Sequence, residues 1–260
     1  MLGAISEKWP GEYSFVLRSL LLKDFRVRYR NMSLGVGWSL ANPLVMMTVL
    51  WFVFTKIFKS NEKNFPIFAL CGLIPFNFFT LAWISATTSL VGNASLIKRT
   101  RFPREIVPIS TVFGNCVHFF IQIGLLLVMV LFFGEGINAH WVWLPLIVGL
   151  EILFTVGMGL AFSAIDVYIR DIRYVVESTN VVLFWLVPIF YPFSIIPDKY
   201  KDIYAFNPIA AVVMAFRNVL YENKAPAFSI LWKMGLVSLL VFGVGSFLFE
   251  RLKKRFYDYL

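Results

Sequence analysis

Long stretches without a charged side chain constrain the fold of this chain more than any other feature. The clearest lies between Arg30 and Lys56, where segment 34–55 holds only apolar, small and uncharged polar residues. A helix needs about 20 predominantly apolar residues to cross the roughly 30 Å hydrocarbon core of a bilayer. Inside lipid, every backbone N–H and C=O group must also be bonded within the protein, which a helix achieves alone. The sequence therefore predicts membrane-spanning helices.

The predicted fold is an all-α polytopic membrane protein with six spanning helices. Hydrophobic residues make up 59% of the 260 residues and the mean hydropathy is +0.74, too apolar for an ordinary soluble domain. A membrane β-barrel would show alternating segments of about 10 residues, which this sequence lacks. The six expected spans lie near residues 34–56, 66–91, 107–133, 142–165, 177–195 and 229–249.

Basic residues are divided unevenly between the two sides that six spans create. With both termini on one side, that side holds 16 of the 24 Lys and Arg residues. Lys and Arg collect in the cytoplasmic loops of membrane proteins, so both termini are expected to be cytoplasmic. This topology explains the net charge of +9, and we expect no binding to nucleic acid.

Residues 12–31 are expected to form an amphipathic helix rather than a span. Ser19, Lys23, Arg26 and Arg30 share one face at helical spacing, while apolar residues cover the other side. Such a helix lies in the membrane interface with its basic face toward headgroups or a cytoplasmic partner. The alternative is a simple cationic anchor that follows the positive-inside rule.

Residues 186–226 break the pattern of simple spans. Pro188, Pro192 and Pro197 interrupt helices near the outer end of the fifth span, because proline lacks an N–H donor. The apolar run that follows Asn207-Pro208 is too short to cross a bilayer. We interpret it as part of a short re-entrant or interfacial helix pair on the outer face, and residues 188–224 as a candidate outer gate. The alternative is an amphipathic loop lying on the surface.

Motifs for catalysis, metal binding and internal energy coupling are missing from the sequence. No Gly is followed by Lys, which excludes a phosphate-binding P-loop, and no cluster of His, Cys, Asp or Glu has metal-ligand spacing. Cys71 and Cys116 fall in apolar spans and are expected to be buried thiols. Glu151 lies mid-span, where a charge costs roughly 2.5–3.5 kcal/mol, and is interpreted as a structural group. We expect no cofactor in this chain, so a partner must supply energy for uphill transport.

Several motifs, in order along the chain, resemble those of bacterial polysaccharide-export ABC transporter permeases. Residues 28–38 (RYRNMSLGVGW), followed by Asn42-Pro43-Leu44, are similar to the start of the family's first span. Residues 93–108 (NASLIKRTRFPREIVP) resemble its coupling segment, and residues 168–173 (YIRDIR) resemble its second cytoplasmic loop. Tyr191-Pro192 and Asn207-Pro208 match its outer gate region. The closest resemblance is to permeases that export lipid-linked O-antigen polysaccharide, with capsule and teichoic acid permeases next.

The resemblance implies a domain organisation, partners and a cargo. Residues 1–33 would be a cytoplasmic interface segment and residues 34–260 one ABC-2 type six-helix domain in the bacterial inner membrane. Two copies would form a homodimeric channel and bind two copies of a separate cytoplasmic ATPase, which binds Mg-ATP. The implied cargo is O-antigen polysaccharide on an undecaprenyl-diphosphate carrier. The chain is thus expected to be a transport subunit and not an enzyme.

The segment 93–108 has the composition of a rigid knob that seats in a groove of an ATPase. A short basic helix precedes a Phe-Pro corner, with Phe102 anchored in an apolar notch and basic residues paired with acidic partners. The alternative is plain positive-inside retention. The expected ATPase contacts are Lys98, Arg99, Arg101, Phe102, Pro103, Arg104 and Glu105, with Arg170 and Asp171 from the second loop. Arg170, Asp171 and Arg173 could brace the second cytoplasmic loop, or they could pair only with each other.

Aromatic side chains suit a polysaccharide channel, because stacking on sugar C–H surfaces tolerates sliding. The family is expected to line its pore with spans one and five, and 18% of this chain is aromatic. The alternative for any one aromatic residue is contact with lipid or a neighbouring helix. Arg28 and Arg30 are candidate ligands of the lipid diphosphate, because a guanidinium fork suits phosphate. The expected channel-lining residues are Trp38, Trp51, Phe52, Phe184, Trp185, Phe190 and Tyr191.

Other functions remain open on the sequence. An ABC-2 permease for another cargo, such as capsular polysaccharide, teichoic acid or a drug, would share the fold. A secondary transporter is disfavoured, since the spans show no internal repeat and no set of ion-binding carboxylates. A polyprenyl-lipid enzyme would need paired acidic residues to hold Mg²⁺. The expected cytoplasmic loops offer only Glu105, Asp166, Asp171 and Glu177, with no paired motif.

Overall fold

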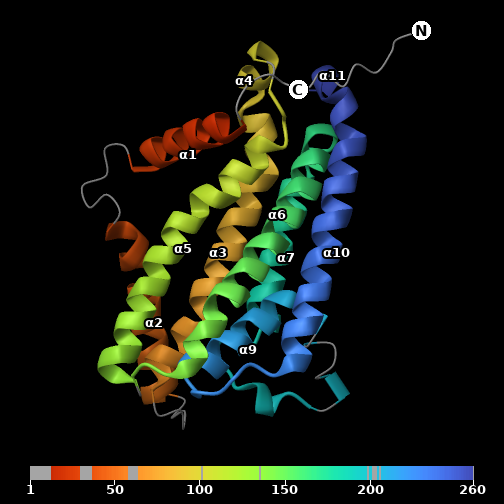
Figure 1. Cartoon of the computed structure of the whole chain (residues 1–260). Coiled ribbons are helices and arrows are strands. Elements are labelled where there is room, and N and C mark those ends of the chain that lie inside the picture. The colour runs from red at the N-terminus through yellow and green to blue at the C-terminus, as the bar shows by residue number, and fades with distance from the viewer. Residues whose placement is uncertain are drawn as a thin grey trace.

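Figure 1 shows the computed structural model of the chain, which describes residues 13–29, 37–57, 64–100, 102–134, 136–197, 199–200, 204 and 206–259. These residues form helices and no strand, which confirms the predicted all-α class. The α-helices are α1 (Tyr13–Tyr29), α2 (Trp38–Trp51), α3 (Phe65–Gly92), α4 (Ala94–Arg99), α5 (Ile106–Phe133), α6 (Leu144–Tyr168), α7 (Ile172–Leu186), α9 (Pro208–Leu220), α10 (Phe228–Leu252) and α11 (Phe256–Tyr259). A π-helix (Phe52–Ile57) continues α2, and short 3-10 helices cover Ala139–Trp143, Phe193–Ile195 and Lys253–Arg255.

Among the described residues, four helical segments are long and apolar enough to cross a membrane. They are α3, α5, α6 together with the 3-10 turn before it, and α10 continued through α11. In this order they match the second, third, fourth and sixth expected spans. The first expected span corresponds to α2 and the π-helix, whose apolar part, Pro43–Ile57, is shorter.

The fifth expected span, 177–195, is wrong in its bounds, because α7 begins at Ile172 and ends at Leu186. Pro188 explains the early end. A proline disfavours helical backbone in the residue before it, and Val187 is extended with ψ 136°.

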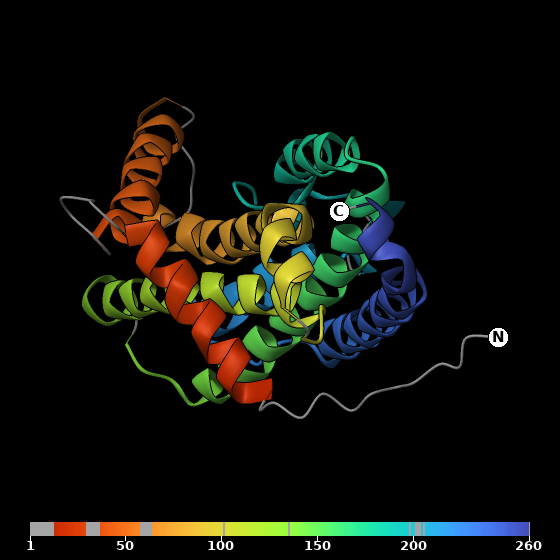
Figure 2. The same ribbon diagram turned by 90° about the horizontal axis from the view of Figure 1, so that it is seen from above.

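α3 is the central helix of the bundle. It packs against α5, α6 and α9, and it also contacts α2 and α7. Ile74, Ala82 and Leu90 along α3 are completely buried. Seen from above, α2 and α7 project toward the same side of α3 (Figure 2). The two helices that correspond to spans one and five therefore flank a common face.

α6 and α10 form the most extensive helix pair, and glycine makes their close approach possible. An added Cβ on Gly157 would lie 2.7 Å from backbone atoms of Phe242. A Cβ on Gly245 would overlap the backbone of Gly157. Small residues at a helix crossing let two backbones touch, which is a common basis of helix association in membranes.

α9 is a short helix enclosed by protein at one end of the bundle. The Asn207 side chain caps it by accepting hydrogen bonds from the backbone N–H groups of Ile209 (3.1 Å) and Ala210 (3.4 Å), and Pro208 occupies the first turn. α9 packs against α3, α6 and α10. The expected short helix is thus confirmed, and the alternative of an amphipathic loop on the surface is wrong.

α1 crosses α5 at the end of the bundle that also holds α4 and α11 (Figures 1 and 2). Leu20 is buried, and Val16 and Leu17 pack against the core, whereas Lys23 and Arg26 are exposed. A helix is therefore present as predicted, but Phe15 and Leu22 are exposed together with the basic residues, and its place at a membrane interface stays a prediction. Arg30 lies outside the described residues.

Most of the described basic residues gather at the end of the bundle marked by α1, α4 and α11. α4 and α11 carry or adjoin several of them, and the loop between α6 and α7 carries more. They include Arg18, Lys23, Arg26, Lys98, Arg99, Arg104, Arg170, Arg173, Arg251, Lys253, Lys254 and Arg255. The uneven division of basic residues along the sequence therefore corresponds to an uneven division between the two ends of the bundle.

Candidate functional site

The segment that resembles a coupling loop follows α3 directly and projects from the end of the bundle. Asn93 forms the turn, and α4 then presents Lys98 and Arg99 to the surface. Ile97 on the opposite face of α4 is only 1% exposed and fixes this short helix to the core. Arg101 lies outside the described residues. Two of the predicted ATPase contacts are therefore free to meet a partner along one edge of α4.

The second half of this segment is committed to contacts within the chain. Phe102 and Pro103 are half-buried, and Phe102 packs against the main core. Arg104 Nη1 donates a hydrogen bond to the Lys253 carbonyl at 2.6 Å, and its guanidinium lies 4.1 Å from the centre of the Tyr257 ring. The structure thus directs Arg104 toward the C-terminal segment.

α1 holds the beginning of the same segment. Lys23 Nζ donates to Asn93 Oδ1 at 2.6 Å, and Asn93 Nδ2 donates to the Ser89 carbonyl at 2.8 Å. Glu105 is half-buried and lies close to Tyr13 of α1. Burial, with a contribution from the Glu105 charge, raises the pKa of the Tyr13 phenol, so this group is neutral at physiological pH.

The second loop is braced by an ion pair that the sequence motif did not identify. Arg173 Nη2 lies 3.5 Å from Asp166 Oδ1, and the Asp166 side chain is fully buried. Arg173 Nε also donates to the Arg170 carbonyl at 3.0 Å. Arg170 and Asp171 themselves are exposed. The sequence predicts no partner for Asp166, and the structure pairs it with an arginine in the first turn of α7.

The predicted channel-lining aromatic residues fall into two groups. Four are exposed on α2, the π-helix and α7, namely Trp38, Trp51, Phe52 and Trp185. Phe184 and Phe190 pack inside, where Phe190 lies 5.2 Å from Phe184 and 5.9 Å from Phe54 between ring centres. The Tyr191 hydroxyl donates to the Leu186 carbonyl at 2.9 Å.

The side of α3 that carries α7 also carries polar residues. Thr80 Oγ1 donates to Asn180 Oδ1 of α7 at 3.1 Å. Asn77, Ser85 and Thr88 are partly exposed along the same stripe of α3, and Leu81 between them is half exposed. Residues three or four apart share a face of a helix, so this stripe runs from Asn77 to Thr88 in the second half of α3. The sequence analysis did not identify it, although the spacing of Asn77, Thr80 and Thr88 was visible.

The predicted lipid-diphosphate ligands cannot be placed on this surface. Arg30 and the side chain of Arg28 lie outside the described residues. What the structure describes nearby is the backbone of α1 up to Tyr29, at the basic end of the bundle.

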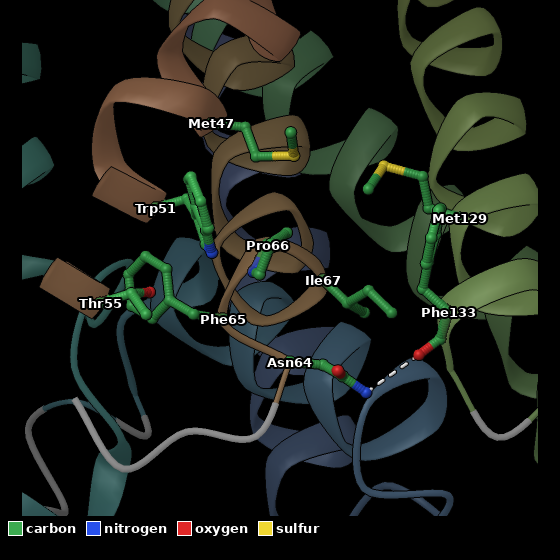
Figure 3. A pocket seen from close by; sticks show the side chains of 9 residues that line it. All are labelled: Met47, Trp51, Thr55, Asn64, Phe65, Pro66, Ile67, Met129 and Phe133. Carbon is green, nitrogen blue, oxygen red and sulfur yellow. Dashed lines mark hydrogen bonds between the residues drawn. The ribbon is translucent and has the colours of Figure 1, made fainter. Parts of the chain in front are cut away.

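A pocket of about 300 Å³ opens at the opposite end, between α2, α5 and the start of α3 (Figure 3). Its walls are largely apolar. Asn64 Nδ2 donates to the Phe133 carbonyl at 3.0 Å across its floor. The lining residues are Met47, Trp51, Thr55, Asn64, Phe65, Pro66, Ile67, Met129 and Phe133.

Among the described residues, no group of three or more His, Cys, Asp or Glu side chains could hold a metal ion. Cys71 and Cys116 are buried free thiols, as predicted. Glu151 is 1% exposed within α6, and its carboxylate oxygens have no hydrogen-bond partner among the described residues.

Comparison with known proteins identifies relatives that extend over most of the chain. Residues 16–221 match the family described as ABC-2 type transporter. An O-antigen export system permease protein of Klebsiella pneumoniae is 31% identical over 259 residues, which cover 99% of this chain and 100% of that protein. One from Myxococcus xanthus is 28% identical over 94% of this chain and 95% of its own length. The polysialic acid transport protein KpsM of Escherichia coli is 24% identical over 86% of this chain and 90% of its own length.

Proposed function

Because this chain belongs to the ABC-2 type transporter family, we propose that it is the permease half of an ATP-driven exporter of O-antigen polysaccharide. Its partners are a second copy of the chain and two copies of a cytoplasmic ATPase. Its cargo is O-antigen on an undecaprenyl-diphosphate carrier, moved outward across the bacterial inner membrane. The relatives named as O-antigen export permeases cover nearly the full chain, which favours this cargo over capsular polysaccharide.

The observation that carries the proposal is the exposed basic edge of α4. Lys98 and Arg99 project beyond the bundle at the end where most described basic residues gather (Figure 1). Basic ends of membrane proteins face the cytoplasm, so this end would face the ATPase and both termini would be cytoplasmic. Charge complementarity across such a contact guides docking and fixes its register.

The common face of α2, α3 and α7 supplies one half of a channel in this proposal. The exposed rings of Trp38 and Trp185 would offer flat surfaces for sugar C–H groups, and the polar stripe of α3 would offer hydrogen bonds to hydroxyls. Trp51 instead lines the pocket beside α5. A second copy of the chain, facing the first across this surface, would close the channel. Contacts of this kind are weak individually, so a polymer can slide past them.

In the membrane, α2 with the π-helix would form the first of six spans, and α7 with the residues that follow it would form the fifth. α9 would be a re-entrant helix, shielded from lipid by α3, α6 and α10. α1 would lie in the inner interface. Exposed Phe15 and Leu22 would enter the lipid, while Arg18 and Arg26 meet the headgroups near Arg28 and Arg30, which we retain as ligands of the lipid diphosphate.

Charge reversal on α4 tests the central part of the proposal. The double variant Lys98→Glu with Arg99→Glu should weaken co-purification with the cognate ATPase on the order of 100-fold, because it replaces attraction by repulsion across the contact. Lys199→Glu with Lys224→Glu provides the matched control, since these exposed lysines lie near the opposite end. Absence of any ATPase on the wild-type protein, or equal binding by both double variants, would refute the assignment.

Aromatic truncation on α7 tests the channel face. Trp185→Ala should reduce O-antigen on the cell surface about fivefold, because an aromatic contact contributes roughly 1 kcal/mol. Phe132→Ala is the control, since Phe132 is 78% exposed but lies on α5, away from the common face, compared with 68% for Trp185. Both variants are compared at equal permease abundance, measured by immunoblotting. Equal export by the two variants would exclude α7 from the cargo path.

A further inference from the structure

Side chains from two other segments bond backbone carbonyls where α10 ends and the 3-10 turn after it begins. The Tyr168 hydroxyl donates to the Leu252 carbonyl at 2.7 Å, and Arg104 Nη1 donates to the adjacent Lys253 carbonyl at 2.6 Å. The final carbonyls of an α-helix have no partner in its regular ladder, and side chains or a tighter turn bond them instead. The Lys253 carbonyl accepts from both the Phe256 N–H and Arg104. Tyr168 closes α6, and Arg104 stands between α4 and α5.

The C-terminal segment beyond α10 packs as part of the core. Phe256 is completely buried, and its ring meets Phe249 edge-on at 5.5 Å. The Tyr168 and Tyr259 ring centres are 4.6 Å apart, and the guanidinium of Arg104 covers Tyr257. Membrane topology alone would explain a basic tail that lies in solvent. The aromatic residues of this tail instead pack against Tyr168 and Arg104.

Arginine is suited to the position of Arg104. Its planar guanidinium can donate to a carbonyl while one face lies on an aromatic ring, whereas an ammonium group is a compact point charge. Pro103 stiffens the backbone just before Arg104. α5 begins at Ile106, two residues after Arg104. Arg104 therefore joins the loop directly to the segment that follows α10.

From α10 the connection continues into the bundle through closely packed helices. α10 touches α6 backbone to backbone at Gly157 and Gly245, and Tyr168 ties their ends together. The loop is held at its other end by the bond from Lys23 to Asn93. The loop is thus attached at one end to the α6–α10 pair through Arg104, and at the other end to α1 through Lys23.

We propose that Arg104 and Tyr168 are positioning residues: Arg104 attaches the coupling loop to the segment that follows α10, and Tyr168 ties the end of α10 to α6, so that displacement of the loop by an ATPase moves this helix pair. The inference rests on the proposed function, and it revises the expected role of Arg104. Lys98 and Arg99 contact the ATPase, while Arg104 transmits the movement inward.

Measuring export together with ATP hydrolysis distinguishes a loss of transmitted movement from a loss of ATPase binding. Tyr168→Phe removes one hydroxyl and keeps the ring against Phe256, and Arg104→Gln removes the cation. In the complex with its ATPase, both variants should bind the ATPase as wild type does and hydrolyse ATP within about twofold of its rate. Surface O-antigen per ATP hydrolysed should fall about tenfold, as expected for the loss of one such hydrogen bond. Combining the two changes should add little, because both act through the end of α10.

Matched controls remove the same groups elsewhere. Tyr200→Phe loses a hydroxyl near the other end of the bundle, and Arg251→Gln loses a cation on the last turn of α10. Both should export as wild type does. If Arg104→Gln does not fold, the export per ATP hydrolysed by Tyr168→Phe is the measurement that tests the inference. Export per ATP at the wild-type value in Tyr168→Phe, or a parallel loss of ATPase binding, would overturn the inference.

A distance measurement tests the attachment without the ATPase. Spin labels on Lys98→Cys and Lys254→Cys report the separation of α4 and the C-terminal segment, while buried Cys71 and Cys116 stay unlabelled. A narrow distance distribution is expected in the otherwise wild-type permease, and a broad one after Tyr168→Phe with Arg104→Gln. An unchanged distribution would refute the attachment. If the wild type binds no ATPase but this broadening is seen, the proposed function fails and the attachment stands.

Discussion

Replacing Gly157 with leucine is expected to abolish accumulation of the folded protein. The new Cβ would lie 2.7 Å from the Cα and N of Phe242 and 2.8 Å from the carbonyl carbon of Val241, which are backbone atoms that no rotamer change can move. Overpacking against flexible side chains costs about 1–3 kcal/mol, and forcing two helix backbones apart should exceed this. Fluorescence-detected size-exclusion chromatography of the detergent-solubilised protein should show aggregate in place of the monodisperse peak.

The same two helices supply controls for this experiment. Gly149 on α6 and Gly243 on α10 have no atom within 4 Å of an added Cβ. Gly149→Leu and Gly243→Leu should therefore fold normally, and the higher helix propensity of leucine should favour them by up to about 1 kcal/mol. If Gly157→Leu eluted as these controls do, the two helices would not be in backbone contact at this point.

Replacing Arg217 with methionine is expected to destabilise the end of the bundle around α9. Arg217 is 4% exposed, and it donates to the carbonyls of Ile189 (2.5 Å), Tyr191 (3.1 Å) and Phe68 (3.5 Å) while lying 3.6 Å from the Phe68 ring centre. Methionine fills a similar space but leaves these carbonyls without their donor, at about 1–3 kcal/mol each. Removing the buried charge recovers part of this loss, because its desolvation costs several kcal/mol.

The net loss for Arg217→Met should be about 2–4 kcal/mol of stability, seen as a lower midpoint of thermal unfolding. Hydrogen exchange should rise selectively in residues 187–191, which the guanidinium ties to α9. Lys224→Met, which removes an exposed cation just beyond the same helix, should change the midpoint little. A midpoint for Arg217→Met equal to that of Lys224→Met would show that these bonds do not stabilise the native state.

Much of the helical framework could be predicted from the sequence, because lipid demands long uncharged helices. α3, α5, α6 and α10 follow that rule. α7 did not match its expected bounds, since its charged first turns hid a helix start at Ile172 and Pro188 ended the helix early. The enclosure of α9 depends on three other helices, although the pair Asn207-Pro208 marked its beginning.

The candidate site was predictable where residues stand on the surface and less so where they join distant segments. Lys98 and Arg99 are exposed as the coupling interpretation requires. Arg104 meets Lys253, 149 residues away, and Tyr168 meets Leu252, 84 residues away. Bonds from a side chain to a backbone carbonyl leave no pattern in the sequence, because any residue supplies that acceptor. Composition likewise could not separate the exposed Trp185 from the packed Phe190.

The enclosure of α9 has a consequence for how the protein is made. A helix of 13 residues that carries Arg217 is too short and too polar at its end to enter a bilayer by itself. The groups that accept the Arg217 hydrogens belong to α3 and to residues 189–191, and α9 also rests on α10, which is synthesised after it. The site that encloses α9 is therefore complete only once α10 has been inserted. On this view, the docking of α9 completes assembly of the permease, although α10 follows α9 in the sequence.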